Sequence, residues 1–509
     1  MSHDAQSALA PDGDRVAELL QQFQPQSIPY ERRVFANRNL RMSAVELIGF
    51  DMDYTLAQYH QEVERLAIRL TIQSLVRSYG YPPEIAAFEY DPGFAIIGLT
   101  VDKRYGNLLK MDNHRHISRV FHGLRKVEKP ERRELYRQER LRMSAQRFAL
   151  IDTLFAVPEA WLFARLVEFF ERERGQVLGP EDYERTYDDI RKAIDTVHAD
   201  DSLKDVIRAD LTTYIDRDPE LPATLHRFRV AGKRLFLMTN SYAPYTQAVM
   251  SYLLDGADPR YPTWRDYFDI VVVGSRKPLF FIAEEPFVEL DDAWRPKDVT
   301  VTALIPGRVY LGGNIKDFEA MAGSSGDGIL YVGDNMYGDI LRSKKATTWR
   351  TAMVVPDMER ELQLRALHGA DFARRNELET HRTQIDTELH SQQTLLDALS
   401  DYRAHNTLAP AEVEAFQEAI AISRKSVRRL ERSLKKCLAS IWEVNSRLDE
   451  VFNPNWGMLF KCQVEHSLYG GQVEDYACVY TSRVTNFAAY SPFQYFRTPR
   501  DLLPHEHLV

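Results

Sequence analysis

The sequence predicts an α/β protein with a Rossmann-like parallel sheet, an inserted mixed α/β cap and a long helical hairpin near the C-terminus. Three observations carry this prediction. Short apolar runs alternate with helical patterns and end in polar motifs, which is typical of buried parallel strands. A long stretch of mixed strand and helix signals separates the first such run from the next. Residues 373–451 repeat apolar side chains at heptad spacing.

The first predicted strand leads into two closely spaced carboxylates. The apolar run at 45–49 is followed by Asp51 and Asp53, within Phe-Asp-Met-Asp-Tyr-Thr-Leu at 50–56. The carboxyl ends of parallel strands carry the active sites of open α/β sheets. Two acids at i and i+2 repel each other unless a cation or a proton lies between them. The motif predicts a magnesium-dependent phosphoryl-transfer site in which Asp51 attacks phosphorus and Asp53 handles the proton.

After this motif we expect a helix and then an insertion. Apolar residues recur at helical spacing over 63–76. Strand-like signals follow at 94–101, a Gly-Asn turn at 106–107 and a helix at 160–172. An insertion over 61–220 would sit over the carboxyl end of the sheet. There it would hold the part of the substrate that does not react, and it would exclude water.

The predicted sheet resumes at 234–238, which opens into Thr239, Asn240 and Ser241. A hydroxyl, a carboxamide and free backbone N–H groups just past a strand bind anions well, and the next helix would add its positive end. This string predicts a phosphate cradle.

Two further strands end in charged groups. The run at 269–273 leads to Lys277, which would clamp phosphoryl oxygens. The run at 329–332 precedes Asp334 and Asp339, whose oxygens would complete the shell of a metal ion. The last core strand is predicted at 352–355.

The heptads over 373–451 break at 406–410 and therefore predict an antiparallel helical hairpin. Heptads show that one face of each helix packs against a partner, but they do not show what that partner is. The hairpin could be a structural arm on the core or an oligomer contact, and the sequence favours neither. The C-terminal segment that follows the hairpin is too rich in aromatic residues to stay exposed to water, so it should pack on the core. The expected parts are an N-terminal arm (1–29), a catalytic core (30–60 and 221–372), the cap (61–220), the hairpin (373–451) and an aromatic C-terminal segment (452–509).

Composition excludes several classes of function. The 509 residues carry a net charge of −9 without a dense basic run, so we expect no nucleic-acid partner. No apolar run is long enough to span a bilayer, and the N-terminus lacks the order of a secretory signal, so we expect no membrane partner. Cys437, Cys462 and Cys478 lack metal-ligand spacing and fit a reducing compartment. We expect a cytoplasmic protein.

Four strings carry a resemblance to a known family. The strand-end motifs, in their order, resemble those of the haloacid dehalogenase (HAD) superfamily of phosphatases. More narrowly, the sequence is similar to the cytosolic purine 5′-nucleotidases specific for IMP and GMP, roughly over 30–360 and again over 456–506. The strings are Gly-Phe-Asp-Met-Asp-Tyr-Thr-Leu (49–56), Tyr-Gly-Asn-Leu-Leu-Lys (105–110), Ser-Arg-Lys-Pro (275–278) and Gly-Asp-Ile-Leu-Arg-Ser-Lys-Lys (338–345).

The resemblance implies a role for each catalytic residue. Asp51 would be the nucleophile that becomes an aspartyl phosphate. Asp53 would protonate the departing ribose oxygen, then activate the hydrolytic water, and its backbone carbonyl would reach Mg²⁺. Thr239 and Asn240 would bind the phosphoryl group, and Lys277 would neutralise its charge. Asp334 would be a magnesium ligand, with Asp339 close by. Phosphoryl transfer depends mostly on positioning and charge neutralisation, which these groups supply.

The resemblance also implies a base and ribose pocket on the cap. Phe155 matches a family aromatic that stacks on the purine. The matching polar residues are Arg191, Asp195, His198 and Lys204, of which the first three share one helical face. Ala156 departs from the family, which has an asparagine there. Losing an amide that reads the base edge costs about 1–3 kcal/mol for the bases that used it.

Tyr337 falls where the family stacks the adenine of an effector, so the resemblance implies nucleotide activation. We expect a homo-oligomer, either a dimer or a tetramer.

The expected function is that of a Mg²⁺-dependent cytosolic 5′-nucleotidase. It would hydrolyse purine nucleoside 5′-monophosphates through an aspartyl phosphate, with transfer to a nucleoside acceptor as a related activity. Two alternatives stay open: a HAD phosphatase for another phosphomonoester, motivated by Ala156, and a non-catalytic scaffold that uses the hairpin.

Overall fold

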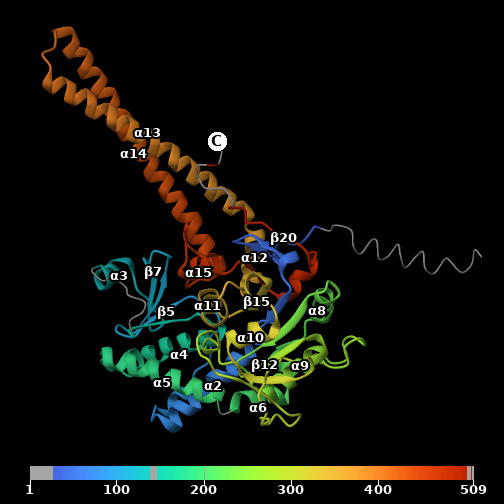
Figure 1. Ribbon diagram of the computed structural model, residues 1–509. Helices are drawn as coiled ribbons and strands as arrows, with labels where there is room; N and C mark the ends of the chain where they lie inside the picture. The colour runs from blue at the N-terminus through green and yellow to red at the C-terminus, as the bar shows by residue number, and fades with distance from the viewer. Residues whose placement is uncertain (1–26, 138–145, 200, 501–505, 507–509) are drawn as a thin grey trace, which may run out of the picture.

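A nine-stranded sheet forms the centre of the molecule within the described residues of the computed structural model, which are 27–137, 146–199, 201–500 and 506 (Figure 1). Its order is β1-β19-β16-β15-β3-β11-β12-β14-β13. The strands from β19 to β14 run parallel, and β1 and β13 pair antiparallel at the two edges. The strand bounds are β1 (Phe35–Ala36), β3 (Leu47–Phe50), β11 (Arg234–Met238), β12 (Ile270–Val273), β13 (Phe287–Glu289), β14 (Val309–Gly312), β15 (Ile329–Gly333), β16 (Arg350–Val354) and β19 (Val479–Thr481).

Both faces of this sheet are buried, which explains the continuous apolar runs in the sequence. In β3, Ile48 and Phe50 join the hydrophobic cluster on one face, and Leu47 joins the cluster on the other. Gly49 lies opposite Phe236 of β11, and a Cβ atom at Gly49 would come within 1.9 Å of the Phe236 ring. The strand therefore requires glycine at this position.

The strands predicted from apolar runs are confirmed as β3, β11, β12, β15 and β16, within one or two residues of the predicted bounds. The prediction that 352–355 is the last core strand is wrong, because β19 follows it in the chain and pairs with β16. The strands at or next to the two edges of the sheet, β1, β13, β14 and β19, are two to four residues long. Runs this short carry no periodicity, and pairing partners far along the chain decide their structure.

Helices cover the core sheet on both faces (Figure 1). A π-helical segment, Met336–Leu341, follows β15 and leads directly into α11. The core helices are α8 (Leu221–Val230), α9 (Ala243–Leu254), α10 (Ile315–Ala322), α11 (Arg342–Ala346), α12 (Met358–Leu367) and α15 (Leu468–Tyr476).

A second sheet, antiparallel and five-stranded within the described residues, lies in the segment predicted to be the cap. The chain enters and leaves this segment at one place, since β4 (Gln58–Tyr59) pairs with β10 (Ile215–Asp216). The strands, in the order β8-β7-β6-β5-β9, are β5 (Thr100–Asp102), β6 (Asn107–Met111), β7 (Ile117–His122), β8 (Arg125–Lys126) and β9 (Phe148–Leu150). The helices are α2 (Gln61–Ser78), α3 (Lys129–Tyr136), α4 (Val157–Glu168), α5 (Pro180–Ala199), α6 (Ser202–Ala209) and α7 (Leu211–Tyr214).

The helices predicted in this segment are confirmed, but the strand predicted at 94–101 is wrong over most of its length. Only its end belongs to β5, and 94–99 is turn and coil. Phe94, Ile97 and Leu99 are nevertheless buried, so the apolar signal reflects burial of an irregular segment.

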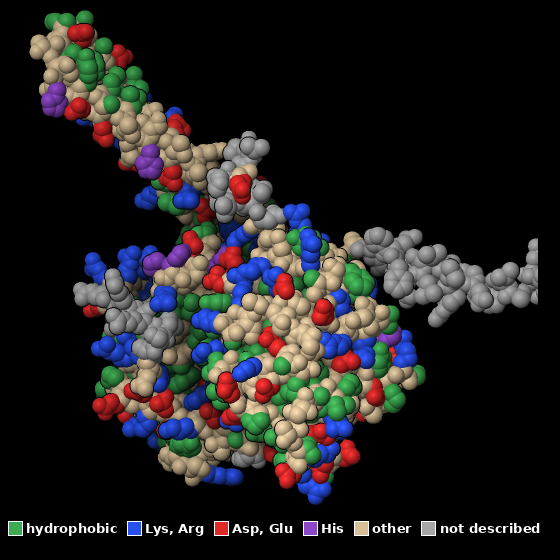
Figure 2. Space-filling model, in the orientation of Figure 1, with side chains coloured by type: hydrophobic (Ala, Val, Ile, Leu, Met, Phe, Trp, Pro, Cys, Tyr) green, Lys and Arg blue, Asp and Glu red, His purple; other side chains and the backbone are tan. Residues whose placement is uncertain are grey.

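The predicted hairpin is confirmed as α13 (Gly369–His405) and α14 (Pro410–Phe452), which project from the body as a single arm (Figure 1). At 1.5 Å per residue these helices are about 55 and 65 Å long. Leu389, Leu430 and Cys437 belong to the apolar seam between them. Figure 2 shows hydrophobic side chains at the surface near the tip. Exposed apolar residues on the arm are Leu395, Tyr402, Ile422, Leu438 and Trp442.

The aromatic C-terminal segment is packed against the rest of the molecule. Trp456 and Tyr469 are each 1% exposed, and β19 joins the central sheet. Two short antiparallel pairs lie outside both sheets. β2 (Leu40–Arg41) pairs with β20 (Tyr495–Phe496), and β17 (Lys461–Cys462) pairs with β18 (Glu465–His466). Most of the predicted N-terminal arm lies outside the described residues. Among the helices of the described residues, none is long and apolar enough to cross a membrane.

Candidate active site

Four neighbouring strands place the predicted catalytic motifs at one edge of the central sheet. The order β15-β3-β11-β12 is continuous, and all four strands are parallel. Their carboxyl ends therefore bring together Asp334 after β15, Asp51 after β3, Thr239 after β11 and Lys277 after β12.

Three carboxylates form the centre of this site. Asp51, Asp334 and Asp339 are buried, and each offers an oxygen that lies within 4.8 Å of the other two. The Lys277 ammonium lies 3.0 Å from Asp51 Oδ1 and 2.7 Å from Asp339 Oδ1. Burial raises the pKa of Asp51, as do Asp339 and Asp53, while Lys277 opposes this effect. The site thus holds more negative charge than one lysine neutralises.

The loop after β15 is shaped to hold Asp339 inside the cluster. A Cβ atom at Gly333 would come within 2.5 Å of Asp339 Oδ2, so only glycine allows this approach. The backbone N–H of Asn335 donates to Asp339 Oδ2 at 3.2 Å. The Asn335 side chain in turn accepts from the N–H groups of Tyr337 (3.0 Å) and Gly338 (2.8 Å), which fixes the start of the π-helical segment.

The three carboxylates fit a divalent cation with oxygen ligands. Burial raises the pKa of Asp334, and the nearby Asp339 and Asp51 raise it further. Their negative charges repel that of Asp334, and a bound cation would relieve this repulsion. Thr55 Oγ1 lies 3.4 Å from Asp334 Oδ1. An all-oxygen set of this kind suits Mg²⁺.

The metal contact expected of Asp53 runs through its backbone carbonyl, and its carboxylate lies outside the cluster of three carboxylates. Its Oδ1 accepts from the Tyr59 hydroxyl at 2.6 Å, and its Oδ2 accepts from the Ser241 hydroxyl at 2.9 Å. In a strand-like segment, residues at i and i+2 point the same way, but the chain turns after Asp51. Asp339, which was expected near the metal, supplies the third carboxylate of the cluster.

Within the predicted phosphate cradle, the Asn240 side chain forms hydrogen bonds to the loop that carries Lys277. Asn240 Oδ1 accepts from the Lys277 N–H (2.6 Å) and the Ser275 hydroxyl (2.9 Å), and its amide donates to the Lys277 carbonyl (2.9 Å). Arg276 adopts a left-handed backbone with φ of 59°, which costs about 1–2 kcal/mol. Thr239 is fully buried, and its hydroxyl accepts from the Ser241 N–H at 3.0 Å.

Phe155 lies beside the catalytic loop although it belongs to the inserted segment. Its ring centroid is 4.7 Å from that of Tyr54 and 5.7 Å from that of His198. Tyr54 directly follows Asp53 and has a φ of 53°, so a strained tyrosine connects the catalytic motif to this aromatic group.

Of the polar cap residues, Arg191 and Asp195 lie together on α5, with 3.3 Å between guanidinium and carboxylate. Arg191 also pairs with Glu159 of α4, a residue that is 1% exposed and that the sequence analysis missed. His198 Nδ1 contacts the Ile194 carbonyl at 2.8 Å, and its Nε2 is buried without a hydrogen-bond partner among the described residues. Burial lowers the pKa of His198.

Lys204 and Tyr337 complete the predicted set. The Lys204 ammonium lies 5.7 Å from the Tyr245 ring centroid, and the Tyr245 hydroxyl contacts Tyr59 at 2.9 Å. Tyr337 is 39% exposed, and the Arg342 guanidinium covers its ring at 4.7 Å.

Sequence reasoning missed several residues that surround the predicted groups: Thr55, Tyr59, Glu159, Ser275 and Tyr331. Tyr331 donates to the Met238 carbonyl at 3.0 Å and also contacts Lys277 at 2.7 Å. Thr55 and Ser275 stand inside the quoted motifs, so the motifs pointed to both positions. The tyrosines and Glu159 show no pattern that distinguishes them from core residues.

Comparison with known proteins gives one family. Residues 34–508 match the profile of the 5′ nucleotidase family. A 5′-nucleotidase domain-containing protein of Dictyostelium discoideum is 28% identical over 479 residues, which are 93% of this chain and 74% of that protein. Among solved structures, CbbY from Rhodobacter sphaeroides, in complex with phosphate, aligns at 14% identity with a TM-score of 0.23, over 61% of this chain and 86% of its own. A predicted phosphoglycolate phosphatase from Haemophilus somnus aligns at 12% identity with a TM-score of 0.25, over 62% and 87%.

Proposed function

Since the chain belongs to the 5′ nucleotidase family, we propose that it is a Mg²⁺-dependent 5′-nucleotidase for purine nucleoside 5′-monophosphates of the IMP and GMP type. The products are a nucleoside and phosphate. The observation that carries this proposal is the buried group of Asp51, Asp334, Asp339 and Lys277 at the carboxyl end of the parallel sheet.

In the first half of the proposed reaction, an Asp51 oxygen attacks phosphorus and the bond from phosphorus to the ribose 5′ oxygen breaks. Asp53 gives its proton to that oxygen. The hydroxyls of Tyr59 and Ser241 hold the Asp53 carboxylate in place, and Lys277 neutralises charge near Asp51. The product stays on the enzyme as an aspartyl phosphate.

In the second half, Asp53 takes a proton from water, the water oxygen attacks phosphorus, and the bond to Asp51 breaks. A nucleoside hydroxyl that replaced the water would accept the phosphoryl group instead. Asp51, Asp334 and Asp339 would hold Mg²⁺, which supplies charge stabilisation on the phosphoryl oxygens when it is bound. Thr239 and Asn240 would bind the phosphoryl group through backbone N–H groups as well as side chains.

The purine is assigned to the cap residues. Phe155 supplies a ring beside the catalytic loop, and Arg191, Asp195, His198 and Lys204 supply polar groups for the base and ribose. Ala156 is buried and offers no amide to the base edge. The affinity for 6-oxopurines then depends more on Arg191 and its partners.

The test is phosphate release in the presence of Mg²⁺ from IMP, GMP, AMP, CMP and several sugar phosphates. We expect IMP and GMP to give the highest kcat/KM, and we expect Asp51→Asn to release no phosphate. Asp397→Asn, an exposed position on α13, is the matched control and should behave as wild type. Failure with every nucleoside monophosphate would overturn the proposal.

A second candidate function is a phosphatase for a different phosphomonoester, and Ala156 is the observation that favours it. Sugar phosphates that exceed IMP and GMP in the same assay would establish this alternative. A scaffold without catalysis is disfavoured because the nucleophile, proton donor, lysine and carboxylates are all present.

We also propose a homo-oligomer, a dimer or a tetramer, and an effector site at Tyr337. The exposed apolar residues of the α13–α14 arm support the first proposal, and the exposed ring of Tyr337 supports the second. Light scattering behind size exclusion tests the oligomer. Assays with ATP on wild type and Tyr337→Ala test the effector site.

A further inference from the structure

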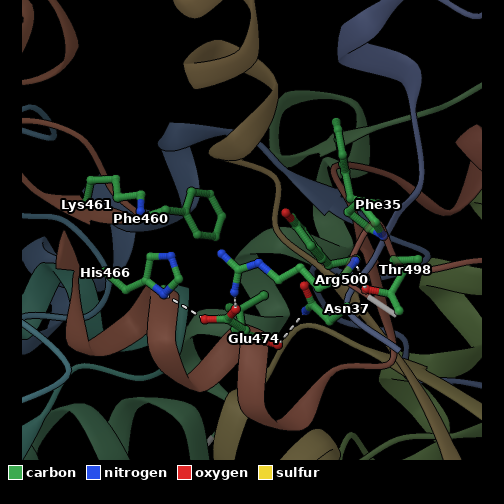
Figure 3. A pocket seen from close by; sticks show the side chains of 13 residues that line it. Phe35, Asn37, Phe460, Lys461, His466, Glu474, Thr498 and Arg500 are labelled. Atoms are coloured by element: carbon green, nitrogen blue, oxygen red, sulfur yellow. Dashed lines mark hydrogen bonds and ion pairs between the residues drawn. The ribbon is translucent and has the colours of Figure 1, made fainter. Parts of the chain in front are cut away.

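A pocket of about 320 Å³ opens at the β1 edge of the central sheet, away from the proposed active site (Figure 3). Five separate segments build it, and one of them, 498–500, contributes Arg500. β1 contributes Phe35, β19 contributes Tyr480, the β17–β18 hairpin contributes Lys461 and His466, and α15 contributes Glu474. β16 and β15 separate this edge from β3, the strand before Asp51. The volume suits a small molecule.

Aromatic rings form one wall of this pocket. Phe35 and Tyr480 stack with centroids 5.4 Å apart and an interplanar angle of 27°. The Phe460 ring lies 6.1 Å from Tyr480. Together the three rings present an apolar surface on which a flat ring can stack.

Among the described residues that line the pocket, one is a carboxylate, Glu474, and it already has two partners. His466 Nδ1 lies 2.6 Å from Glu474 Oε2, and the Arg500 guanidinium pairs with Glu474 Oε1. Figure 3 shows both groups meeting at Glu474. Lys461, in contrast, has no ion-pair partner within the described chain, and its ammonium lies 3.4 Å from the Val464 carbonyl. Glu474 forms no ion pair with Lys461 within the described residues.

Further cations stand close to the pocket. Burial lowers the pKa of Lys461, and the like charges of Arg500 and Arg375 lower it further, whereas Glu474 and Glu465 raise it. Arg375 and Arg365 both lie over the Phe372 ring, at 5.2 and 4.3 Å from its centroid. In the part of the chain that the structure describes, neither arginine has a carboxylate partner. A bound anion would relieve this repulsion.

We propose that this pocket binds a small organic anion that carries a flat ring. The ring would lie against Phe35, Phe460 and Tyr480, and the anionic group would bind Lys461 and Arg500. A phosphate, a carboxylate or a sulfonate provides the required charge, so the ligand class is defined by a ring and an anionic group together. This site is separate from the catalytic centre and does not depend on the proposed reaction.

The test uses naphthalene-1-sulfonate as the probe, which contains no phosphate ester for the enzyme to cleave. Its binding to the full chain is titrated by calorimetry in the presence of Mg²⁺. We expect one saturable site that weakens at least tenfold in Lys461→Ala, weakens in Arg500→Ala and weakens as ionic strength rises. Thermal unfolding checks that both variants are folded.

Three controls separate this pocket from other sites. Lys435→Ala removes an exposed lysine from α14 and should leave the affinity unchanged. Asp51→Asn should also leave it unchanged, because the pocket lies outside the catalytic centre. Neutral 2-naphthalenemethanol and inorganic sulfate should each bind more weakly than the probe. Equal affinity in wild type, Lys461→Ala and Arg500→Ala, loss of binding in Asp51→Asn, or no saturable binding would overturn the proposal.

Discussion

Asp53 shows how individual side chains prepare a carboxyl group for proton transfer. Its two oxygens accept from Tyr59 and Ser241, and neither oxygen belongs to the carboxylate cluster around Asp51. Two oriented hydrogen bonds leave few alternative rotamers for the Asp53 side chain. The proposed proton donor is therefore held in place before substrate arrives.

We predict that Tyr59→Phe lowers kcat for a nucleoside monophosphate about tenfold, with little change in KM. The variant removes one hydrogen bond to a charged group, which contributes about 1.5 kcal/mol, but keeps the ring. Steady-state kinetics provides the measurement. Tyr252→Phe is the matched control, because among the described residues its hydroxyl contacts the Ile215 carbonyl, at 3.4 Å, and no catalytic group. A KM effect without a kcat effect in Tyr59→Phe would contradict the assigned role of Asp53.

Glu159 gives the cap a group that titrates near neutral pH. Burial raises its pKa to about 7, against the opposing effect of Arg191, and Tyr187 contacts its Oε2 at 3.3 Å. The folded state therefore binds this proton more tightly than the unfolded state does. Between the ordinary pKa of glutamate, 4.5, and 7, rising pH takes stability away, and above about 7 the ionised carboxylate pairs with Arg191.

We predict that KM for the nucleotide rises severalfold as pH falls from 8 to 6, because protonated Glu159 no longer holds the Arg191 guanidinium. In Glu159→Gln, KM should be high at both pH values, and this part of the pH dependence should disappear. Kinetics at several pH values on both enzymes provides the measurement. Para-nitrophenyl phosphate lacks a base and ribose, so its KM should respond equally in the two enzymes. Parallel pH profiles for the nucleotide would refute the role of Glu159.

At the scale of elements, the α13–α14 arm depends on a narrow apolar seam. Leu430 is 5% exposed and lies in that seam, whereas Leu438, two turns further along α14, is 47% exposed. Most of the remaining surface of the arm is polar or charged. Long helices in water are stable only if such a face is buried.

We predict that Leu430→Ala destabilises the arm by about 2–3 kcal/mol through loss of burial and the cavity that remains. Leu438→Ala, which makes the same chemical change at an exposed position, should change stability by less than about 0.5 kcal/mol. Hydrogen exchange of α13 and α14 amides reports the difference, since the arm can open without the core. Equal exchange in the two variants would show that the seam does not hold the hairpin together.

At the scale of the whole molecule, the C-terminal segment joins parts that are distant in the sequence. β19 extends the central sheet next to β16, while the Trp456 indole donates to the Phe94 carbonyl at 2.6 Å. Lys110, on β6 of the second sheet, is 3% exposed and donates to the Trp456 carbonyl at 2.7 Å and to the Met458 carbonyl. A buried lysine thus ties the inserted segment to the tail.

We predict that Lys110→Met destabilises the protein by about 2–4 kcal/mol, because two buried carbonyls lose a charged donor. Urea unfolding is the measurement. Lys126→Met, at an exposed position on β8, is the matched control and should be nearly neutral. If both variants unfold at the same urea concentration as wild type, Lys110 is not a structural anchor.

From the sequence alone, the parallel core and most of the residues at the candidate site could be predicted. Strands buried on both faces appear as continuous apolar runs, and the groups that follow such strands must meet at one sheet edge. This reasoning predicted β3, β11, β12 and β15 and the approach of Asp51, Lys277 and Asp334. The helical hairpin could also be predicted from the sequence, because its heptad repeat extends over many residues.

Only the tertiary structure decided which carboxylates cluster and what surrounds them. Asp339 joins Asp51 and Asp334 because the Gly333 backbone allows its close approach, whereas Tyr59 and Ser241 engage the Asp53 carboxylate. Glu159 and Lys110 are buried charges whose partners lie far along the chain, so no local pattern reveals them. β19 and the pocket beside it depend on contacts between the two ends of the chain. Periodicity records which face of an element is buried, whereas partners distant in sequence are set only when the elements pack.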